Sequence, residues 1–257
     1  MDPKSSTTSS AQHPVANPAP DGSPVDGTSR PVRIAPPELA RYIDHTLLKP
    51  EATEEQVERL CEEAAQHGFH SVCVNSSHAR RCARRLRGTE VKVCVVAGFP
   101  LGAMDARVKA FEAGTAVSDG AQEIDMVLNV GGLKARNAAL VREDILAVRR
   151  ACSGGALLKV ILETCLLSDE EKVLGCKIAQ EAGADFVKTS TGFNKGGATL
   201  ADVALMRQTV GPGMGVKAAG GVRGYQDAVA MIQAGASRLG TSAGVLLVSG
   251  EKAQGDY

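Results

Sequence analysis

The sequence of 257 residues has no excess of charge of either sign, because 29 basic residues are balanced by 29 acidic ones. A chain without a basic surplus has no overall attraction for nucleic acid or for an anionic membrane surface. It also lacks an apolar run of the roughly 18 residues that a membrane span requires, and its N-terminus has no hydrophobic core of a signal peptide. These absences predict a cytoplasmic protein whose partner is a small molecule, with no nucleic acid and no membrane involved.

Disulfide and metal patterns are missing as well. The cysteines form an odd set without CxxC spacing, which indicates reduced thiols; they are Cys61, Cys73, Cys82, Cys94, Cys152, Cys165 and Cys176. No histidines form an HxH or HxxxH pair, and only His45 lies in a predicted strand that could reach a central site. We expect His45 to be structural, and we predict a site without a metal.

The N-terminal segment has almost no large apolar side chains. Residues 1–35 consist mainly of Ser, Thr, Pro, Ala, Gln and Gly. Such a segment cannot offset the entropy lost on ordering. The sequence therefore predicts a disordered tail over 1–35 and a single domain over 36–257.

From residue 36 onward, strand and helix patterns alternate. Helix ends are legible at Thr53, at Ser168 with Glu171, and at Thr199, each a predicted N-cap. Eight βα units in about 220 residues match the (β/α)8 barrel, or TIM barrel, better than an open doubly wound sheet. The eight predicted strands are Tyr42 to Leu47, Ser71 to Asn75, Val91 to Ala97, Glu123 to Asn129, Leu157 to Glu163, Asp185 to Thr191, Gly215 to Gly220 and Ser237 to Thr241.

Alternation within these strands predicts which side chains line the barrel. Successive side chains of a strand point to opposite faces. In EIDMVLN the polar face carries Glu123, Asp125 and Asn129, and in LLKVILE it carries Lys159 and Glu163. The same pattern places Lys188 of DFVKTST and Lys217 of GVKAAGG inside. A structural ion pair remains an alternative for Lys159 and Glu163, but buried charge is costly and the whole set favours a catalytic centre.

Two neighbouring lysines suggest amine chemistry. A lysine attacks a carbonyl only when unprotonated, and a second cation nearby lowers its pKa toward that state. Lys217 can be that cation for Lys188. A Schiff base on Lys188 then acts as an electron sink, while Asp125, directly or through water, moves protons. The pattern predicts an aldolase.

Glycine-rich loops follow the late strands. They contain Gly192, Gly196-Gly197, Gly220-Gly221 and Gly240-Thr241-Ser242. Backbone N–H groups at such turns suit a phosphate, which this fold commonly binds after its last strands. The combination favours a phosphorylated sugar as substrate.

The chain resembles the deoxyribose-phosphate aldolase family over roughly residues 40 to 250. The resemblance is carried, in chain order, by YIDHTLLKP, AGFPLGA, EIDMVLNVG, LKVILET, FVKTSTGF with NKGGAT, and VKAAGGVR. It implies a class I aldolase, a lyase of deoxyribonucleotide catabolism and carbohydrate degradation. This enzyme would interconvert 2-deoxy-D-ribose 5-phosphate with D-glyceraldehyde 3-phosphate and acetaldehyde without metal or organic cofactor.

The resemblance also implies residue roles. Lys188 would form the Schiff base, Lys217 would lower its pKa and Asp125 would transfer protons. The implied phosphate contacts are Gly192, Gly220, Gly221, Gly240 and Ser242, although Ala243 stands where some members have a second serine. Supporting candidates are Lys159, Glu163, Asp44 of YIDHTLLKP and the C-terminal Tyr257, whose phenol could exchange a proton with the enamine on Lys188.

Three alternatives remain open at this stage. Another Schiff-base aldolase or a transaldolase would share Lys188, but the second lysine in VKAAGGVR argues against it. A sugar-phosphate isomerase would use the loops and a carboxylate without needing two lysines. A barrel that only binds sugar phosphate, without catalysing a reaction, is the alternative outside enzymes.

A homo-oligomer, in the first place a dimer, is the expected assembly.

Overall fold

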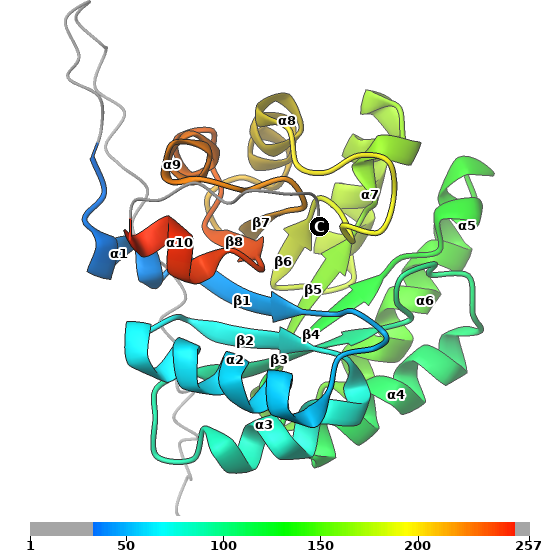
Figure 1. Cartoon of the computed structure of the whole chain (residues 1–257). Helices are drawn as coiled ribbons and strands as arrows, with labels where there is room; N and C mark the ends of the chain where they lie inside the picture. The colour runs from blue at the N-terminus through cyan, green and yellow to red at the C-terminus, as the bar shows by residue number, and fades with distance from the viewer. Residues whose placement is uncertain (1–32, 250–257) are drawn as a thin grey trace, which may run out of the picture.

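The computed structural model describes residues 33–249, so most of the predicted tail (1–32) and the C-terminal segment with Tyr257 lie outside the described residues. Eight parallel strands hydrogen-bond in chain order and close into a barrel, with β1 paired to β8 (Figure 1). The predicted TIM barrel is confirmed. Its strands are β1 (Ile43–Leu47), β2 (Ser71–Val74), β3 (Lys92–Ala97), β4 (Glu123–Val127), β5 (Leu157–Ile161), β6 (Phe186–Lys188), β7 (Gly215–Ala219) and β8 (Arg238–Thr241).

Helices surround the barrel and connect its strands (Figure 1). They are α1 (Pro36–Ala40), α2 (Glu54–His67), α3 (Ala79–Arg85), α4 (Ala106–Ser118), α5 (Val130–Lys134), α6 (Ala138–Ala151), α7 (Asp169–Glu181), α8 (Leu200–Val210), α9 (Tyr225–Gln233) and α10 (Gly244–Ser249). Short 3-10 turns lie at Ser76–His78, Ser153–Gly155 and Thr164–Leu166. Across residues 33–249, none of the helices combines the length and apolar character needed to cross a membrane.

The predicted helix caps are confirmed. Thr53 forms a capping box with Gln56, and Ser168 forms one with Glu171, so each cap satisfies two backbone donors. The Thr199 hydroxyl accepts a hydrogen bond from the Asp202 amide at the start of α8. These caps fix where each helix begins after its strand and loop.

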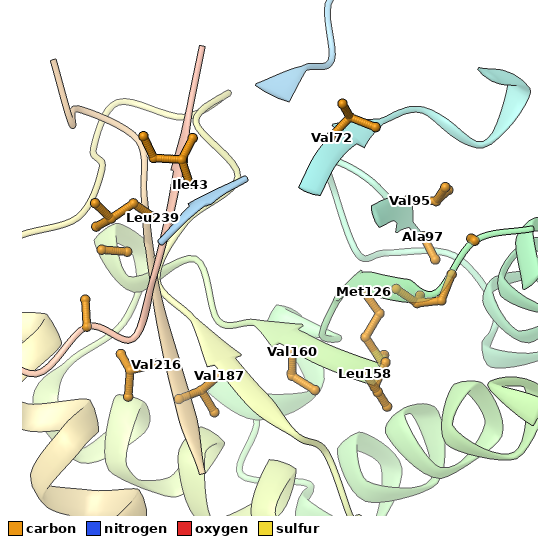
Figure 2. Packing of buried hydrophobic residues seen from close by; sticks show 14 of the residues in the cluster. Ile43, Val72, Val95, Ala97, Met126, Leu158, Val160, Val187, Val216 and Leu239 are labelled. Atoms are coloured by element: carbon orange, nitrogen blue, oxygen red, sulfur yellow. The ribbon is translucent and has the colours of Figure 1, made fainter. Parts of the chain in front are cut away.

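The apolar faces of the strands pack against the helices. Figure 2 shows this layer, with Ile43, Val72, Val95, Met126, Leu158, Val160, Val187, Val216 and Leu239 among its buried members. The intervening residues face inward, including Asp44 between Ile43 and His45, and Asp125 between Ile124 and Met126. Within the observed strands, the alternation predicted from the sequence is confirmed, and their polar side chains face the lumen.

Three strands end two or more residues earlier than predicted. β4 stops at Val127 because the Asn129 side chain accepts from the Gly132 amide and caps α5. β5 stops at Ile161, and two residues later Glu163 has a φ of 58°, which ends extended structure. β6 stops at Lys188. Lys188 therefore lies at the carboxyl end of its strand, beside the loops of the barrel mouth.

Candidate active site

Two lysines on neighbouring strands share one carboxylate oxygen. Lys188 of β6 and Lys217 of β7 are paired across the two strands. Their Nζ atoms lie 2.9 and 2.8 Å from the same Oδ2 of Asp125, so the two nitrogens are within about 6 Å of each other. All three side chains are buried. The structure thus brings together the three residues that the sequence predicted to be catalytic.

Asp125 binds further donors through its second oxygen. Oδ1 lies 2.7 Å from Lys159 Nζ and 3.1 Å from Cys94 Sγ. Burial opposes ionisation of Asp125, but its interactions with Lys159, Lys188 and Lys217 outweigh the effect of burial and hold the pKa of the carboxyl well below its usual range. Asp125 is therefore a carboxylate at any pH at which the protein would work.

A second layer of charge lies beneath these groups. Arg238 Nη1 contacts Asp44 Oδ1 at 2.8 Å and Glu123 Oε2 at 3.0 Å. Lys159 Nζ lies 2.6 Å from Glu123 Oε2, and Lys217 Nζ lies 2.5 Å from Asp44 Oδ2. The guanidinium of Arg238 also lies over the ring of Phe186, 5.2 Å from its centroid. The supporting roles predicted for Asp44 and Lys159 thus have a geometric basis.

The charges of this cluster do not cancel when every group is ionised. Its seven charged side chains are Asp44, Glu123, Asp125, Lys159, Lys188, Lys217 and Arg238. Burial opposes the charge on Lys217 and Lys159, yet the surrounding carboxylates raise the pKa of both above its ordinary value. The carboxylates of Asp44, Glu123 and Asp125 are therefore matched by Lys159, Lys217 and Arg238. A proton on Lys188 would add a positive charge for which the cluster holds no further carboxylate.

Two thiols border the cluster. Cys73 and Cys94 are cross-strand partners on β2 and β3, and both are buried. The hydrogen bond to Cys94 lowers the pKa of Cys73 to about 7, while burial raises that of Cys94. Their sulfur atoms approach Asp125 closely enough for a three-ligand metal group in the described part of the chain. Because the side chains of Lys159, Lys188 and Lys217 already occupy the oxygens of Asp125, this donor set does not suit a metal cation.

The glycine loops lie at the same end of the barrel as Lys188. Gly192, Gly220 and Gly221 have φ values of 84°, 81° and 82°, which strain any other residue. A Cβ on Gly197 would lie 2.4 Å from the Gly220 carbonyl oxygen, so the loops after β6 and β7 pack backbone against backbone. Glycines at such positive φ values let successive N–H groups point to one side, as an anion site requires.

Gly240 differs from these glycines, since it lies inside β8. A Cβ there would come within 3.0 Å of the Lys217 side chain and of Ala219. Its lack of a side chain makes room for Lys217, which is a physical reason for glycine other than the phosphate contact predicted. Ser242, the next predicted contact, is exposed and lines a cavity of about 340 Å³. The end of β1 with Thr46 and the loop after it with Leu48 and Lys49 also line this cavity.

Glu163 does not join the lysine cluster, contrary to the strand alternation predicted from the sequence. Its backbone turns to positive φ, and its carboxylate accepts hydrogen bonds from the Thr191 amide and hydroxyl. These hydrogen bonds fix the loop after Lys188.

Ser190 lies in the loop after Lys188, and its buried Oγ has no hydrogen-bond partner within the described part of the chain. His45 Nε2 lies 2.8 Å from Glu63 Oε2 of α2, a contact that suits the structural role predicted for it.

Sequence reasoning missed Arg238 and gave no site role to Glu123. Arg238 alternates with the outward Leu239, so the same strand periodicity could have identified it in SRLG. Glu123 was predicted to face inward, but only the fold reveals its contacts with Arg238 and Lys159. Tyr257 lies outside the described residues.

A closed eight-stranded parallel barrel with buried lysines and carboxylates inside it and glycine loops at its mouth defines a class, the (β/α)8-barrel enzymes. Residues 39–249 match the family model for DeoC/LacD family aldolase. The chain belongs to this family, and it is an aldolase and thus a lyase.

Curated relatives agree with the family model. A deoxyribose-phosphate aldolase from Streptococcus sanguinis is 63% identical over 219 residues, covering 85% of this chain and 99% of the relative. One from Streptococcus gordonii is 61% identical with the same coverage.

Solved structures agree as well. A putative deoxyribose-phosphate aldolase from Coccidioides immitis is 43% identical with a TM-score of 0.82, covering 86% of this chain and 87% of its own. A deoxyribose phosphate aldolase from Aeropyrum pernix, described as having a unique tetrameric structure, is 39% identical with a TM-score of 0.78, covering 84% of this chain and 91% of its own.

Proposed function

We propose that this protein is a deoxyribose-phosphate aldolase that cleaves 2-deoxy-D-ribose 5-phosphate to D-glyceraldehyde 3-phosphate and acetaldehyde through a Schiff base on Lys188. The observation that carries the proposal is the contact of Lys188 and Lys217 with one oxygen of Asp125. Relatives named deoxyribose-phosphate aldolase cover 85% of the chain. The barrel would extend over 36–257, without a cofactor, in a cytoplasmic catabolic enzyme.

The reaction would begin with Lys188. Its free amine attacks the C1 carbonyl of the open-chain sugar, and loss of water leaves a protonated imine. A base then takes the proton of the C3 hydroxyl, the C2–C3 bond breaks, and its electron pair moves into the imine to form an enamine. Glyceraldehyde 3-phosphate leaves, C2 takes a proton, and water releases acetaldehyde from Lys188.

Asp125 and Lys217 would serve this sequence differently. Lys217 keeps its proton because its ion pairs with Asp125 and Asp44 raise its pKa, so it supplies the fixed cation that favours a free amine at Lys188. Asp125 stabilises the positive imine, and it passes protons through a bound water, since its low pKa makes it a weak proton store.

The loops would hold the other end of the substrate. Amides near Gly192, Gly220, Gly221 and Ser242 are the proposed phosphate contacts, supported by the positive φ values of the three glycines. The unpartnered Ser190 hydroxyl lies between Lys188 and Gly192 along the chain, and it is suited to a hydroxyl of the sugar.

The first test is a chemical trap. Incubation with deoxyribose 5-phosphate and borohydride should reduce the imine and attach the substrate carbons covalently to Lys188, which peptide mass mapping detects. A Lys188→Met variant serves as the control and should remain unlabelled. Labelling at Lys217 alone, or at no lysine, contradicts the proposed chemistry.

We also propose a homo-oligomer, in the first place a dimer. Val108 and Phe111, one turn apart on α4, are 54% and 78% exposed. Exposed apolar side chains grouped on one helix face favour association with another protein surface.

A further inference from the structure

The charged cluster extends from one end of the barrel to the other. Lys188 is the last residue of β6 and lies at the carboxyl end. Glu123 and Arg238 are the first residues of β4 and β8, so they lie at the opposite, amino-terminal end. Lys159 connects the two levels, because its Nζ binds Glu123 Oε2 at 2.6 Å and Asp125 Oδ1 at 2.7 Å. A change of charge at the amino-terminal end can therefore reach the catalytic end through direct contacts.

His70 connects this cluster to solvent. It immediately precedes β2, and its Nε2 lies 3.0 Å from Glu123 Oε1. The His70 side chain is 32% exposed, whereas that of Glu123 is 2% exposed. Its backbone is fixed on both sides, since its amide donates to the Ile43 carbonyl and its carbonyl accepts from the Lys92 amide. The imidazole thus remains beside the buried carboxylate while it exchanges protons with water.

The charged neighbours of His70 come from several elements. Glu123 of β4 is its direct partner, and Arg238 of β8 shares that partner, with Nη1 3.3 Å from the same Oε1. Lys159 of β5 holds the other oxygen of Glu123, Asp44 of β1 holds Arg238, and Lys92 begins the adjacent strand β3. His67 of α2 stacks on Phe69, the residue that precedes His70. An imidazole is the side-chain type whose charge ordinarily changes between pH 5 and 8, and His70 brings one into direct contact with Glu123.

We propose that His70 is a positioning residue for the aldolase reaction, acting on Lys188 through Glu123, Lys159 and Asp125. The proposal rests on the role proposed for Lys188. When His70 is protonated, it forms an ion pair with Glu123, which then attracts Lys159 less. Lys159 binds Asp125 more strongly, and Asp125 stabilises an ammonium at Lys188 less. Direct repulsion between protonated His70 and an ammonium at Lys188 acts in the same direction. Protonated His70 therefore maintains the free amine of Lys188 as the pH falls.

The test compares pH profiles. His70→Gln keeps a side-chain donor to Glu123 but cannot titrate, and His70→Lys keeps a positive charge. His67→Gln, on the neighbouring helix and outside the cluster, is the matched control. kcat/KM with deoxyribose 5-phosphate and the rate of cyanoborohydride trapping at Lys188 are measured from pH 5 to 8.5. In His70→Gln the acid limb should move to higher pH by about 0.3–0.5 unit, a two- to threefold loss near pH 6.

The control and the lysine variant should keep the wild-type acid limb, and the rates of wild type and His70→Gln should converge above pH 8. An unchanged acid limb in His70→Gln, or an equal shift in His67→Gln, overturns the proposal. If wild-type protein shows neither turnover nor trapping, the proposed function has failed instead. In that case, NMR titration of His70 tests the coupling between His70 and Lys188 directly. The midpoint of the His70 titration should rise by a few tenths of a pH unit in Lys188→Met. An unchanged midpoint overturns the proposed coupling.

Discussion

Asp125 is the residue on which the centre depends, because both of its oxygens accept from cations. Three lysine side chains and the Cys94 thiol converge on a single carboxylate. Two adjacent lysines thereby acquire different roles: Lys217 has a second carboxylate partner in Asp44, whereas Lys188 is the additional amine in an otherwise balanced cluster. The distribution of partners explains how one lysine stays charged next to another that reacts.

Lys217→Leu should therefore lower activity by orders of magnitude near neutral pH. Without Lys217, the remaining carboxylates exceed the fixed cations by one, and a proton on Lys188 restores the balance. Part of the activity should return at alkaline pH, where Lys188 loses that proton. The pH dependence of kcat/KM measures this, with Lys177→Leu on the exposed surface of α7 as the control. A wild-type profile in Lys217→Leu would remove Lys217 from its tuning role.

Asp125→Asn should lose turnover by about 10²- to 10⁴-fold, because an amide cannot exchange a proton. It should also lose about 3–5 kcal/mol of stability, since the buried ammonium groups of Lys159 and Lys217 lose their shared counter-charge. The pKa of Asp125 is lowered by folding, so its stabilisation is complete above pH 4 to 5 and is lost as the pH falls toward the folded value. Denaturant unfolding at pH 7 and pH 3 should show a smaller difference in the variant. Equal stability of both proteins at pH 7 would contradict the anchoring role.

At the scale of elements, a second buried ion pair fixes the helices behind β4. Lys109 of α4 is fully buried, and its Nζ lies 2.7 Å from Asp144 Oδ2 of α6 and 2.9 Å from the Val127 carbonyl at the end of β4. Burial dominates here, since it lowers the pKa of Lys109 and raises that of Asp144 despite their contact. The pair contributes position more than stability.

A double-mutant cycle on this pair should be strongly non-additive. Asp144→Leu alone should cost about 3–5 kcal/mol, because it leaves Lys109 buried without a counter-charge. Lys109→Met with Asp144→Leu should come within about 1 kcal/mol of wild type, since apolar groups replace both charges. Urea unfolding of the four proteins measures the coupling. Additive losses would show that the two side chains act independently.

The elements that sequence predicts well are those whose alternation is regular. In EIDMVLN and LLKVILE, the period of two identified both the helix-facing layer and Asp125 and Lys159 inside the barrel. It failed at Glu163, because a positive φ two residues beyond the strand redirects the side chain, and no pattern of residue types predicts that turn. The sequence pattern predicts that Gly240 belongs to a phosphate-binding loop. In the structure it lies inside β8, where the absence of a side chain makes room for Lys217 of the neighbouring strand.

At the scale of the molecule, the centre is assembled from contacts between residues far apart in the chain. Arg238 and Asp44 are 194 positions apart, and Lys217 and Asp125 are 92 apart. Only closure of the barrel between β8 and β1 brings the first pair together. Sequence could therefore predict which side chains face the lumen, but it could not predict how the charges pair there. That pairing makes the His70 contact with Glu123 relevant to Lys188.

The outer surface should carry the assembly. Val108 and Phe111 lie on the exposed side of α4, and α4 is on the opposite side of the barrel from α8 (Figure 1). Covering such side chains removes roughly 1.5–3 kcal/mol of unfavourable hydration for each. Phe111→Arg should therefore shift the molar mass measured by light scattering toward the monomer, while Leu200→Arg, at a 49% exposed position of α8, should not. A monomeric wild type, or an unchanged mass in Phe111→Arg, would mean that copies of the chain do not associate through this face of α4.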